Sequence, residues 1–255
     1  MARFFVEQVP AEGSTYTLTR ENADHARVLR LRPGEEVTLC DGRGTDCRCT
    51  VEEGLTLRVG SSLPCPAEPQ AQVTLYLAFP KADKAEHVIQ KAVELGAAAI
   101  VLFPSRYCVS RPDDKSLTKK LERWQKIARS AAEQSRRGVI PPVRAADSYA
   151  QAIAEAARAD VPVLFYENEE QLGLREVFAE YDTPPHPSPA ATPSPQGEGF
   201  SVSLMTGAEG GFSEDEIAQA RAAGLKICTL GPRILRCETA PLAGLTAVMY
   251  ALKEI

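Results

Sequence analysis

The 255-residue sequence lacks the features of a membrane or secreted protein. No apolar run approaches the roughly 18 to 20 residues needed to cross a bilayer, and the first residues lack the long apolar core of a signal peptide. We therefore expect a cytoplasmic protein that has no membrane partner.

Cysteine and histidine are too few and too scattered for a disulfide framework or a metal centre. The seven cysteines are an odd number, and the three histidines fall in unrelated contexts. Cys47 and Cys49 are separated by a single residue, and no matching pair lies elsewhere. We expect reduced thiols and no bound metal.

Two nucleotide-binding motifs are also missing, and the chain has fewer basic than acidic residues. Neither a Walker pattern nor a dinucleotide fingerprint occurs, which disfavours NTP and NAD chemistry. The net charge of -5 argues against a protein coated in positive charge, yet residues 106–144 hold eleven Lys or Arg against four acidic residues. One face of the molecule is predicted to be basic, with a solvated helix surface as the alternative interpretation.

Residues 1–68 read as a small β-rich domain. Short strands are expected near Phe4, Tyr16, Val37 and Cys49, with one helix at 22–29 and a turn at 41–44. This pattern resembles a compact barrel. Residues 61–69 contain three prolines and predict a linker, which sets a domain boundary near residue 68.

Residues 69–255 alternate between strand and helix patterns. Buried-type strands at 73–79 and 99–103 are separated by a helix that stops at Gly96, and a long amphipathic helix is expected at 116–136. The alternation predicts an α/β fold with a parallel sheet. Residues 183–199 hold six prolines and no large apolar side chain, which predicts a flexible surface insertion.

Two glycine-bearing loops follow successive strands near the end of the chain. A strand at 200–205 runs into loop 207–211, and Ser213 with Glu216 forms a capping-box pattern that opens a helix. The second loop crowds Arg233, Arg236 and Glu238 into six residues. Loops at the carboxyl ends of parallel strands indicate a ligand site, although a glycine cluster alone is also typical of a structural turn.

These two loops resemble a known family. The segments GAEGGFSEDE at 207–216 and LGPRILRCETA at 230–240 are similar to the signature of ribosomal RNA small subunit methyltransferase E, a SPOUT-class family. Segments at 3–6, 25–30 and 41–44 look like its PUA-like RNA-binding domain, and those at 90–96 and 131–137 look like its helical signatures. The resemblance covers nearly the whole chain except the proline-rich insertion.

The resemblance implies an enzyme that methylates N3 of a uridine in 16S ribosomal RNA of the small subunit. S-adenosylmethionine is the implied methyl donor, and a homodimer is implied. The implied architecture is a PUA-like β-barrel domain at 1–68 followed by a SPOUT-type α/β domain at 69–255, tied in a trefoil knot. Knots are excluded by general topology rules, so no pattern in the sequence predicts this one.

The resemblance also implies roles for individual residues. Arg236 is the candidate for stabilising negative charge on the uracil, with Glu238 orienting it and capping the following helix. The expected cofactor-binding residues are Phe79, Thr206, Gly207, Glu209, Gly210, Gly211, Leu230, Gly231, Ile234, Leu235 and Thr239. The expected RNA-binding residues are Arg27, Arg30, Arg43, Arg106, Arg111, Arg123, Arg136 and Arg137.

Two residues depart from the family pattern. Ala208 stands where proline is usual, and Cys237 stands where threonine is usual. We do not expect a nucleophilic thiol, because methylation of uracil N3 needs no covalent adduct with the base. Two alternatives stay open: a non-catalytic RNA-binding module of the same fold, and a SPOUT methyltransferase that acts on another RNA.

Overall fold

The computed structural model describes residues 2–81, 83–179 and 199–255, which form two compact units. The smaller unit comprises the described residues of Met1–Glu68 together with Ala132–Ile140, and the larger comprises those of Pro69–Ala131 and Pro141–Ile255. The return of the segment 132–140 to the smaller unit leaves no trace in the sequence pattern. Nearly all of the predicted insertion at 183–199 lies outside the described residues.

The smaller unit is built on a five-stranded sheet in the order β1-β3-β4-β5-β2. Strand β1 runs parallel to β3, and the other neighbours are antiparallel. Phe4, Val37, Leu39 and Leu57 are fully buried in its core. The elements are β1 (Ala2–Phe5), β2 (Thr15–Thr17), α1 (Arg20–Val28), β3 (Glu36–Cys40), β4 (Thr45–Val51), the 3-10 helix η1 (Glu53–Leu55) and β5 (Thr56–Pro64).

The predicted linker at 61–69 is wrong in its first half. Residues up to Pro64 continue β5, where Leu63 pairs with Asp46 and Pro64 pairs with Thr45. Strand β2 covers only the start of β5, so these residues are paired on one side and a proline is tolerated at the strand end.

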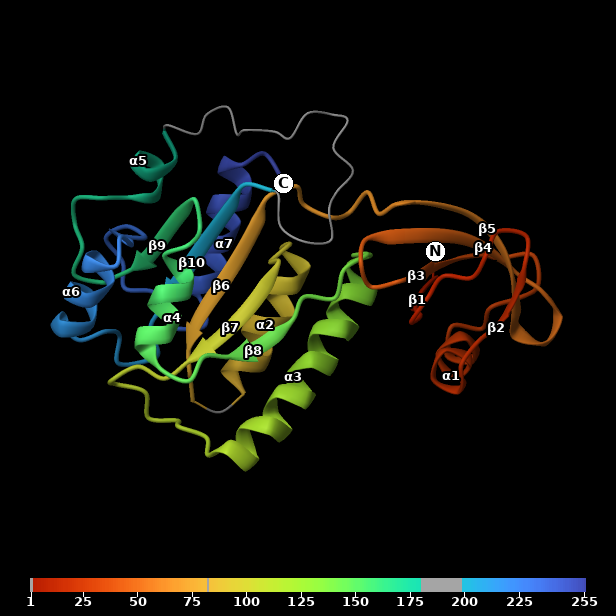
Figure 1. Ribbon diagram of the computed structural model, residues 1–255, viewed down its shortest axis with the longest axis horizontal. Coiled ribbons are helices and arrows are strands. Elements are labelled where there is room, and N and C mark those ends of the chain that lie inside the picture. Colours follow the sequence, from red (N-terminus) through yellow and green to blue (C-terminus); the bar gives the residue numbers. More distant parts are fainter. Residues whose placement is uncertain (1, 82, 180–198) are drawn as a thin grey trace. The chain divides into compact units, whose positions relative to one another are not determined.

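The larger unit is an α/β fold around a six-stranded parallel sheet, which confirms the predicted fold class. The strand order is β11-β9-β10-β6-β7-β8. Helix α7 packs against β6 and β10, and α4 packs against β7 and β10. In Figure 1, α4 lies in front of these strands and α7 behind them, so both faces of the sheet are covered. This explains why the strands read as continuous apolar runs.

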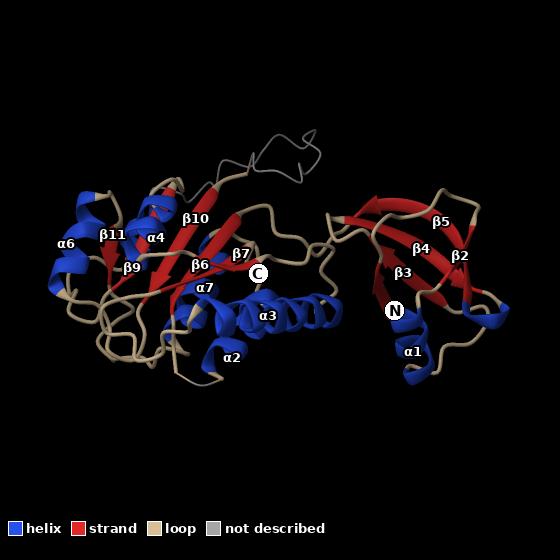
Figure 2. Cartoon of the chain, turned by 60° about the horizontal axis from the view of Figure 1, so that its bottom comes forward, coloured by secondary structure: helices blue, strands red, loops and turns tan. Residues whose placement is uncertain are grey.

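Figure 2 shows the strands and helices of this unit in a second view. The strands are β6 (Gln72–Ala78), β7 (Ala99–Phe103), β8 (Val143–Ala145), β9 (Val161–Phe165), β10 (Ser201–Thr206) and β11 (Lys226–Cys228). The helices are α2 (Lys84–Glu94), α3 (Asp114–Gln134), α4 (Tyr149–Ala156), α5 (Leu174–Phe178), α6 (Glu214–Ala222) and α7 (Ala240–Ala251). Among the described residues, no helix is long and apolar enough to span a bilayer.

The position of β10 determines where the loops of interest meet. It lies between β9 and β6, and Met205 is paired with both Leu164 and Tyr76. Strand β11 follows on the far side of β9, with Cys228 beside Phe165. All of these strands are parallel, so the loops after β9, β10 and β11 leave the same edge of the sheet.

Candidate active site

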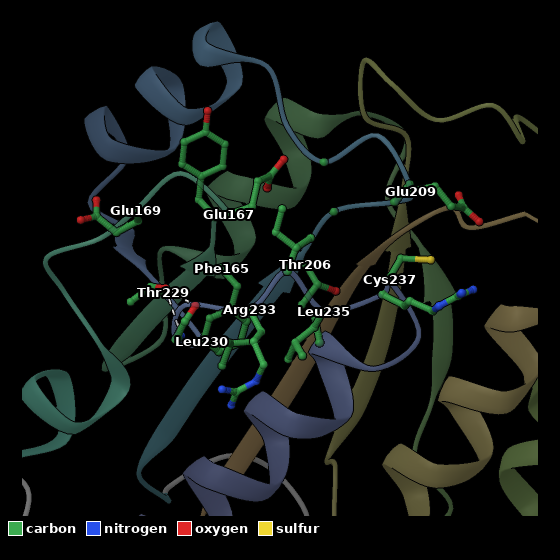
Figure 3. Close-up of a pocket in the computed structure, with 18 of the residues that line it drawn as sticks. Phe165, Glu167, Glu169, Thr206, Glu209, Thr229, Leu230, Arg233, Leu235 and Cys237 are labelled. Carbon is green, nitrogen blue, oxygen red and sulfur yellow. Dashed lines mark hydrogen bonds between the residues drawn. The ribbon is translucent and has the colours of Figure 1, made fainter.

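A cavity of about 760 Å³ opens at the carboxyl ends of β9, β10 and β11. Three chain segments form most of its wall, each following one of these strands (Figure 3). Lys84 at the start of α2 also lines the cavity. The lining residues are Lys84, Phe165, Tyr166, Glu167, Glu169, Glu170, Thr206, Gly207, Ala208, Glu209, Gly211, Thr229, Leu230, Gly231, Pro232, Arg233, Ile234, Leu235, Arg236, Cys237 and Ala240.

The loop after β10 is a tight turn that only glycine permits at its two ends. The N–H of Gly211 donates to the carbonyl of Ala208 over 3.0 Å, and a Cβ on Gly207 would lie 3.0 Å from the Cα of Gly211. Gly211 itself has a φ of +64°, and a Cβ there would overlap the carboxylate of Glu167. The loop backbone therefore comes close to the cavity without side chains in the way.

The capping box predicted at the start of the next helix is confirmed. The N–H of Ser213 donates to Glu216 Oε2 over 2.9 Å, and the N–H of Glu216 donates to the Ser213 hydroxyl over 3.4 Å. The reciprocal bonds fix the point at which loop 207–211 enters α6.

The segment after β11 supplies the apolar part of the wall. Leu230 and Leu235 line the cavity together with Phe165 from the end of β9. The Phe165 ring lies so close to Gly244 of α7 that a Cβ on this glycine would overlap it. The turn itself is closed by Thr229, whose hydroxyl accepts from the N–H of Gly231 over 3.1 Å. Ile234, also in the wall, is 85% exposed.

Lys84 bridges the loop after β10 and the segment after β11. Its Nζ lies 3.1 Å from Glu209 Oε1 and 3.1 Å from Glu238 Oε2. Burial acts to raise the pKa of Glu209, but backbone N–H groups and Lys84 outweigh it, and the pKa lies below its usual range. The pKa of Glu238 is lowered as well, by the backbone N–H of Glu238 itself, by the Cys237 thiol and by Lys84. Both carboxylates are therefore ionised at neutral pH.

This pairing corrects the role expected of Glu238. The carboxylate that we expected to orient Arg236 binds Lys84 instead. The expected capping is also missing, because α7 begins at Ala240 and no side-chain hydrogen bond caps it at Thr239. The Arg236 guanidinium is exposed and has no hydrogen bond or ion pair in the described part of the chain.

Cys237 lies against the same carboxylate. Its Sγ is 3.3 Å from Glu238 Oε2, and burial together with that contact raises the pKa of the thiol to about 12. The thiol is therefore protonated at neutral pH and is a poor nucleophile.

The structure brings most of the expected cofactor-binding residues to the cavity. Phe79, Gly210 and Thr239 are outside its lining, and Phe79 is only 6% exposed. Gly210 serves a packing purpose, since a Cβ there would lie 2.7 Å from the Cβ of Tyr107. The cavity-lining members are Thr206, Gly207, Glu209, Gly211, Leu230, Gly231, Ile234 and Leu235.

Sequence reasoning missed the whole wall after β9. The buried five-residue strand that ends at Phe165 is followed by three glutamates at 167, 169 and 170, a strand-end signal of the same kind as the two glycine loops. Lys84 was also missed, and no local pattern singles it out.

The expected RNA-binding arginines are divided between the two units. In the larger unit, Arg106 pairs with Asp215 and Arg123 with Glu86, while Arg111 donates to two backbone carbonyls. All three are exposed. In the smaller unit the exposed members are Arg27, which pairs with Asp24, and Arg30, Arg43 and Arg136.

Arg137 is the exception, and its expected phosphate contact is wrong. The side chain is 4% exposed and its Nη2 lies 2.8 Å from Glu68 Oε2. The other oxygen of Glu68 accepts from the N–H groups of Gly138 and Val139 over 2.7 and 3.0 Å. Arg137 therefore holds the segment 132–140 within the smaller unit and is not available to an RNA backbone.

Comparison with known families defines the class of protein. Residues 66–249 match the family described as "RNA methyltransferase domain", and residues 18–57 match the family described as "RNA methyltransferase PUA domain". The cavity thus lies in the part of the chain that matches an RNA methyltransferase domain, and the smaller unit contains the part that matches a PUA domain.

Named relatives specify the family within that class. The chain is 34% identical to ribosomal RNA small subunit methyltransferase E of Bacillus subtilis, covering 98% of this chain and 96% of the relative. The protein of that name from Mycobacterium tuberculosis is also 34% identical, over 96% of this chain and 90% of the relative. The chain belongs to the ribosomal RNA small subunit methyltransferase E family, as its sequence motifs predict.

Two solved structures share the full-length fold. One is a ribosomal RNA small subunit methyltransferase E from Neisseria gonorrhoeae bound to S-adenosyl methionine, with 32% identity, a TM-score of 0.76, and coverage of 98% of this chain and 97% of that one. The other is a putative methyltransferase, Lpg2936, from Legionella pneumophila in complex with the bound cofactor SAM, with 28% identity, a TM-score of 0.79, and coverage of 98% and 97%.

Proposed function

We propose that the protein transfers the methyl group of S-adenosylmethionine to N3 of a uridine in 16S ribosomal RNA of the small subunit. The observation that carries this proposal is that residues of loop 207–211 and of segment 230–237 line one cavity, at the edge where the parallel strands end. Full-length similarity to methyltransferases that bind the same cofactor supports it.

The cavity residues fit this cofactor. A volume of about 760 Å³ is in the range of pockets that enclose a molecule of this size. Phe165, Leu230 and Leu235 offer an apolar surface for an adenine ring, and the glycine backbone of 207–211 permits close approach of a ribose or methionine group. When bound, the cofactor supplies an electrophilic methyl group on a positively charged sulfur.

Arg236 is the chain's own group for the reacting base. Uracil N3 is a weak acid, and its negative charge spreads to O2 and O4 as the proton leaves. Arg236 lines the cavity, and its exposed guanidinium has no partner among the described residues, so it is free to donate two hydrogen bonds to such an oxygen. Glu238, bound to Lys84, holds the backbone beside Arg236 in place.

The exposed arginines provide the proposed RNA contacts. Arg106, Arg111 and Arg123 in the larger unit and Arg27, Arg30, Arg43 and Arg136 in the smaller would meet phosphates of a folded RNA. A homodimer, a trefoil knot and a cytoplasmic location are part of the same proposal, and they stay predictions.

The decisive experiment measures methyl transfer. Labelled S-adenosylmethionine is incubated with small ribosomal subunits that lack the modification and, in parallel, with naked 16S RNA, and the product nucleosides are separated by mass spectrometry. We expect label in 3-methyluridine. Binding of cofactor and RNA without incorporation would leave an RNA-binding module, and label in another nucleoside would show a different target.

Replacement of Gly211 tests the cofactor loop. Gly211→Ala forces a Cβ onto the Glu167 carboxylate and strains a residue with a φ of +64°, so we expect roughly 10-fold weaker binding of S-adenosylmethionine by calorimetry. Gly224→Ala is the matched control: it has a φ of +94° but open space around its Cβ, and it lies outside the cavity lining. Equal affinity of Gly211→Ala and the wild type would contradict this view of the loop.

A further inference from the structure

The ammonium group of Lys84 has every donor occupied by the two cofactor loops. Its three N–H donors face Glu209 Oε1 and Glu238 Oε2, each at 3.1 Å, and Cys237 Sγ at 3.5 Å. Glu209 belongs to the loop after β10, and the other two belong to the segment after β11. A lysine with no donor left over for a ligand acts on the protein itself.

The chain just before α2 also contacts the Glu209 carboxylate, through a backbone N–H. The N–H of Lys81 donates to Glu209 Oε1 over 3.1 Å, so both of these contacts from around the start of α2 converge on a single oxygen. The side chains of Lys84, Glu209 and Glu238 are 29%, 25% and 23% exposed, so water screens their attraction only in part. Glu209 is therefore held by the charge of Lys84, the first residue of α2, and by a backbone hydrogen bond from Lys81 just before it.

The charges of this cluster show what Lys84 prevents. One cation lies between two ionised carboxylates, and the thiol beside them is neutral. Without the ammonium, two like charges from different loops would face each other next to the cavity, which would push loop 207–211 away from segment 230–239.

We propose that Lys84 is a positioning residue of the cofactor site, which holds loop 207–211 against segment 230–239 by binding Glu209 and Glu238 together. The cavity wall would then be set before the cofactor enters, which lowers the cost of ordering it on binding. This inference rests on the proposed methyltransferase function and assigns to α2 a part in it.

The test uses pH to separate a charge effect from simple loss of packing. Lys84→Met keeps an unbranched chain of similar length and removes the charge. At pH 8 both carboxylates are ionised and repel, so we expect about 10-fold weaker binding of S-adenosylmethionine and of S-adenosylhomocysteine. At pH 5.5 the repelling pair takes up a proton, and the deficit should shrink to about 3-fold or less. The wild type should show no such pH dependence, since the pKa of each glutamate lies below its usual range.

A double variant tests directly whether Glu209 and Glu238 repel each other. Adding Glu238→Gln to Lys84→Met removes one of the two like charges, so binding at pH 8 should recover to within about 3-fold of the wild type. Lys91→Met is the matched control, because Lys91 lies on the same helix and pairs with Glu94 over 2.8 Å outside the cavity lining. Circular dichroism of each variant confirms that it is folded.

The outcomes distinguish this proposal from the proposed reaction. Unchanged binding by Lys84→Met, or a deficit that is equal at both pH values and not relieved by Glu238→Gln, would overturn the positioning role. Wild-type protein that binds the cofactor and methylates no uridine would overturn the reaction, while the binding data would still decide the role of Lys84.

Discussion

Replacement of Arg236 by alanine should lower the turnover of methyl transfer by about 100- to 1,000-fold, the usual cost of removing one donor to a developing oxyanion. The reason is that this guanidinium lines the cavity, is exposed, and has no partner in the described part of the chain. Because the contact that we propose for Arg236 is made to the base in the transition state, cofactor affinity should change by less than about 3-fold. Single-turnover kinetics on saturating small subunits measure the first quantity, and calorimetry measures the second.

Two further variants sharpen the assignment of Arg236. Arg236→Lys keeps the charge but loses the forked geometry, so it should recover only part of the rate. Arg158→Ala removes an exposed arginine of the same unit outside the cavity lining and should behave as the wild type. A raised KM for RNA with unchanged kcat would assign Arg236 to RNA binding, and full turnover would exclude both roles.

Replacement of Arg137 by methionine should destabilise the smaller unit by about 2 to 4 kcal/mol. The change leaves the Glu68 carboxylate, 16% exposed, without its cation, and breaking such a pair by removing one partner is costly. The figure is below the cost for a fully buried pair, because the N–H groups of Gly138 and Val139 remain as donors to Glu68.

Two spectroscopic probes locate this destabilisation. The single tryptophan, Trp124, is 4% exposed and lies in the larger unit, so its fluorescence follows that unit, whereas far-ultraviolet circular dichroism follows both. Arg137→Met should lower the urea concentration at which the first part of the dichroism transition occurs. The midpoint of the fluorescence transition should stay unchanged. Arg136→Met, its exposed neighbour, should change stability by less than about 0.5 kcal/mol. If Arg137→Met had unchanged stability and bound RNA more weakly, the original prediction that Arg137 contacts an RNA phosphate would stand.

The sequence allows the larger fold to be predicted because its signals are local. Buried parallel strands appear as short apolar runs, helices appear as apolar residues at helical spacing, and the Ser213–Glu216 capping box needs only four residues. The two glycine loops were found for the same reason, since each follows a recognisable strand. The trefoil knot entered only through the family resemblance, because periodicity carries no information about chain threading.

Contacts between distant residues could not be predicted in this way. Lys84 meets Glu209 across more than a hundred residues, and nothing around it distinguishes it from a solvated helix lysine. Arg137 lies in a basic tract in which no other lysine or arginine is buried, and only the structure shows that it is enclosed beside Glu68. The composition of a charged tract gives an average, whereas the burial of one side chain depends on what folds over it.

The place of β10 between β9 and β6 has a consequence for synthesis on the ribosome. Ser201 pairs with Gln72, and the cavity wall is finished only by the segment that follows β11. Synthesis adds about 5 to 20 residues per second, so β10 is made several seconds or more after β6. During that time the edge of β6 that pairs with β10 is exposed. A nascent chain thus carries the complete small β sheet long before it can hold a methyl donor, and any activity must begin after the last helix has emerged.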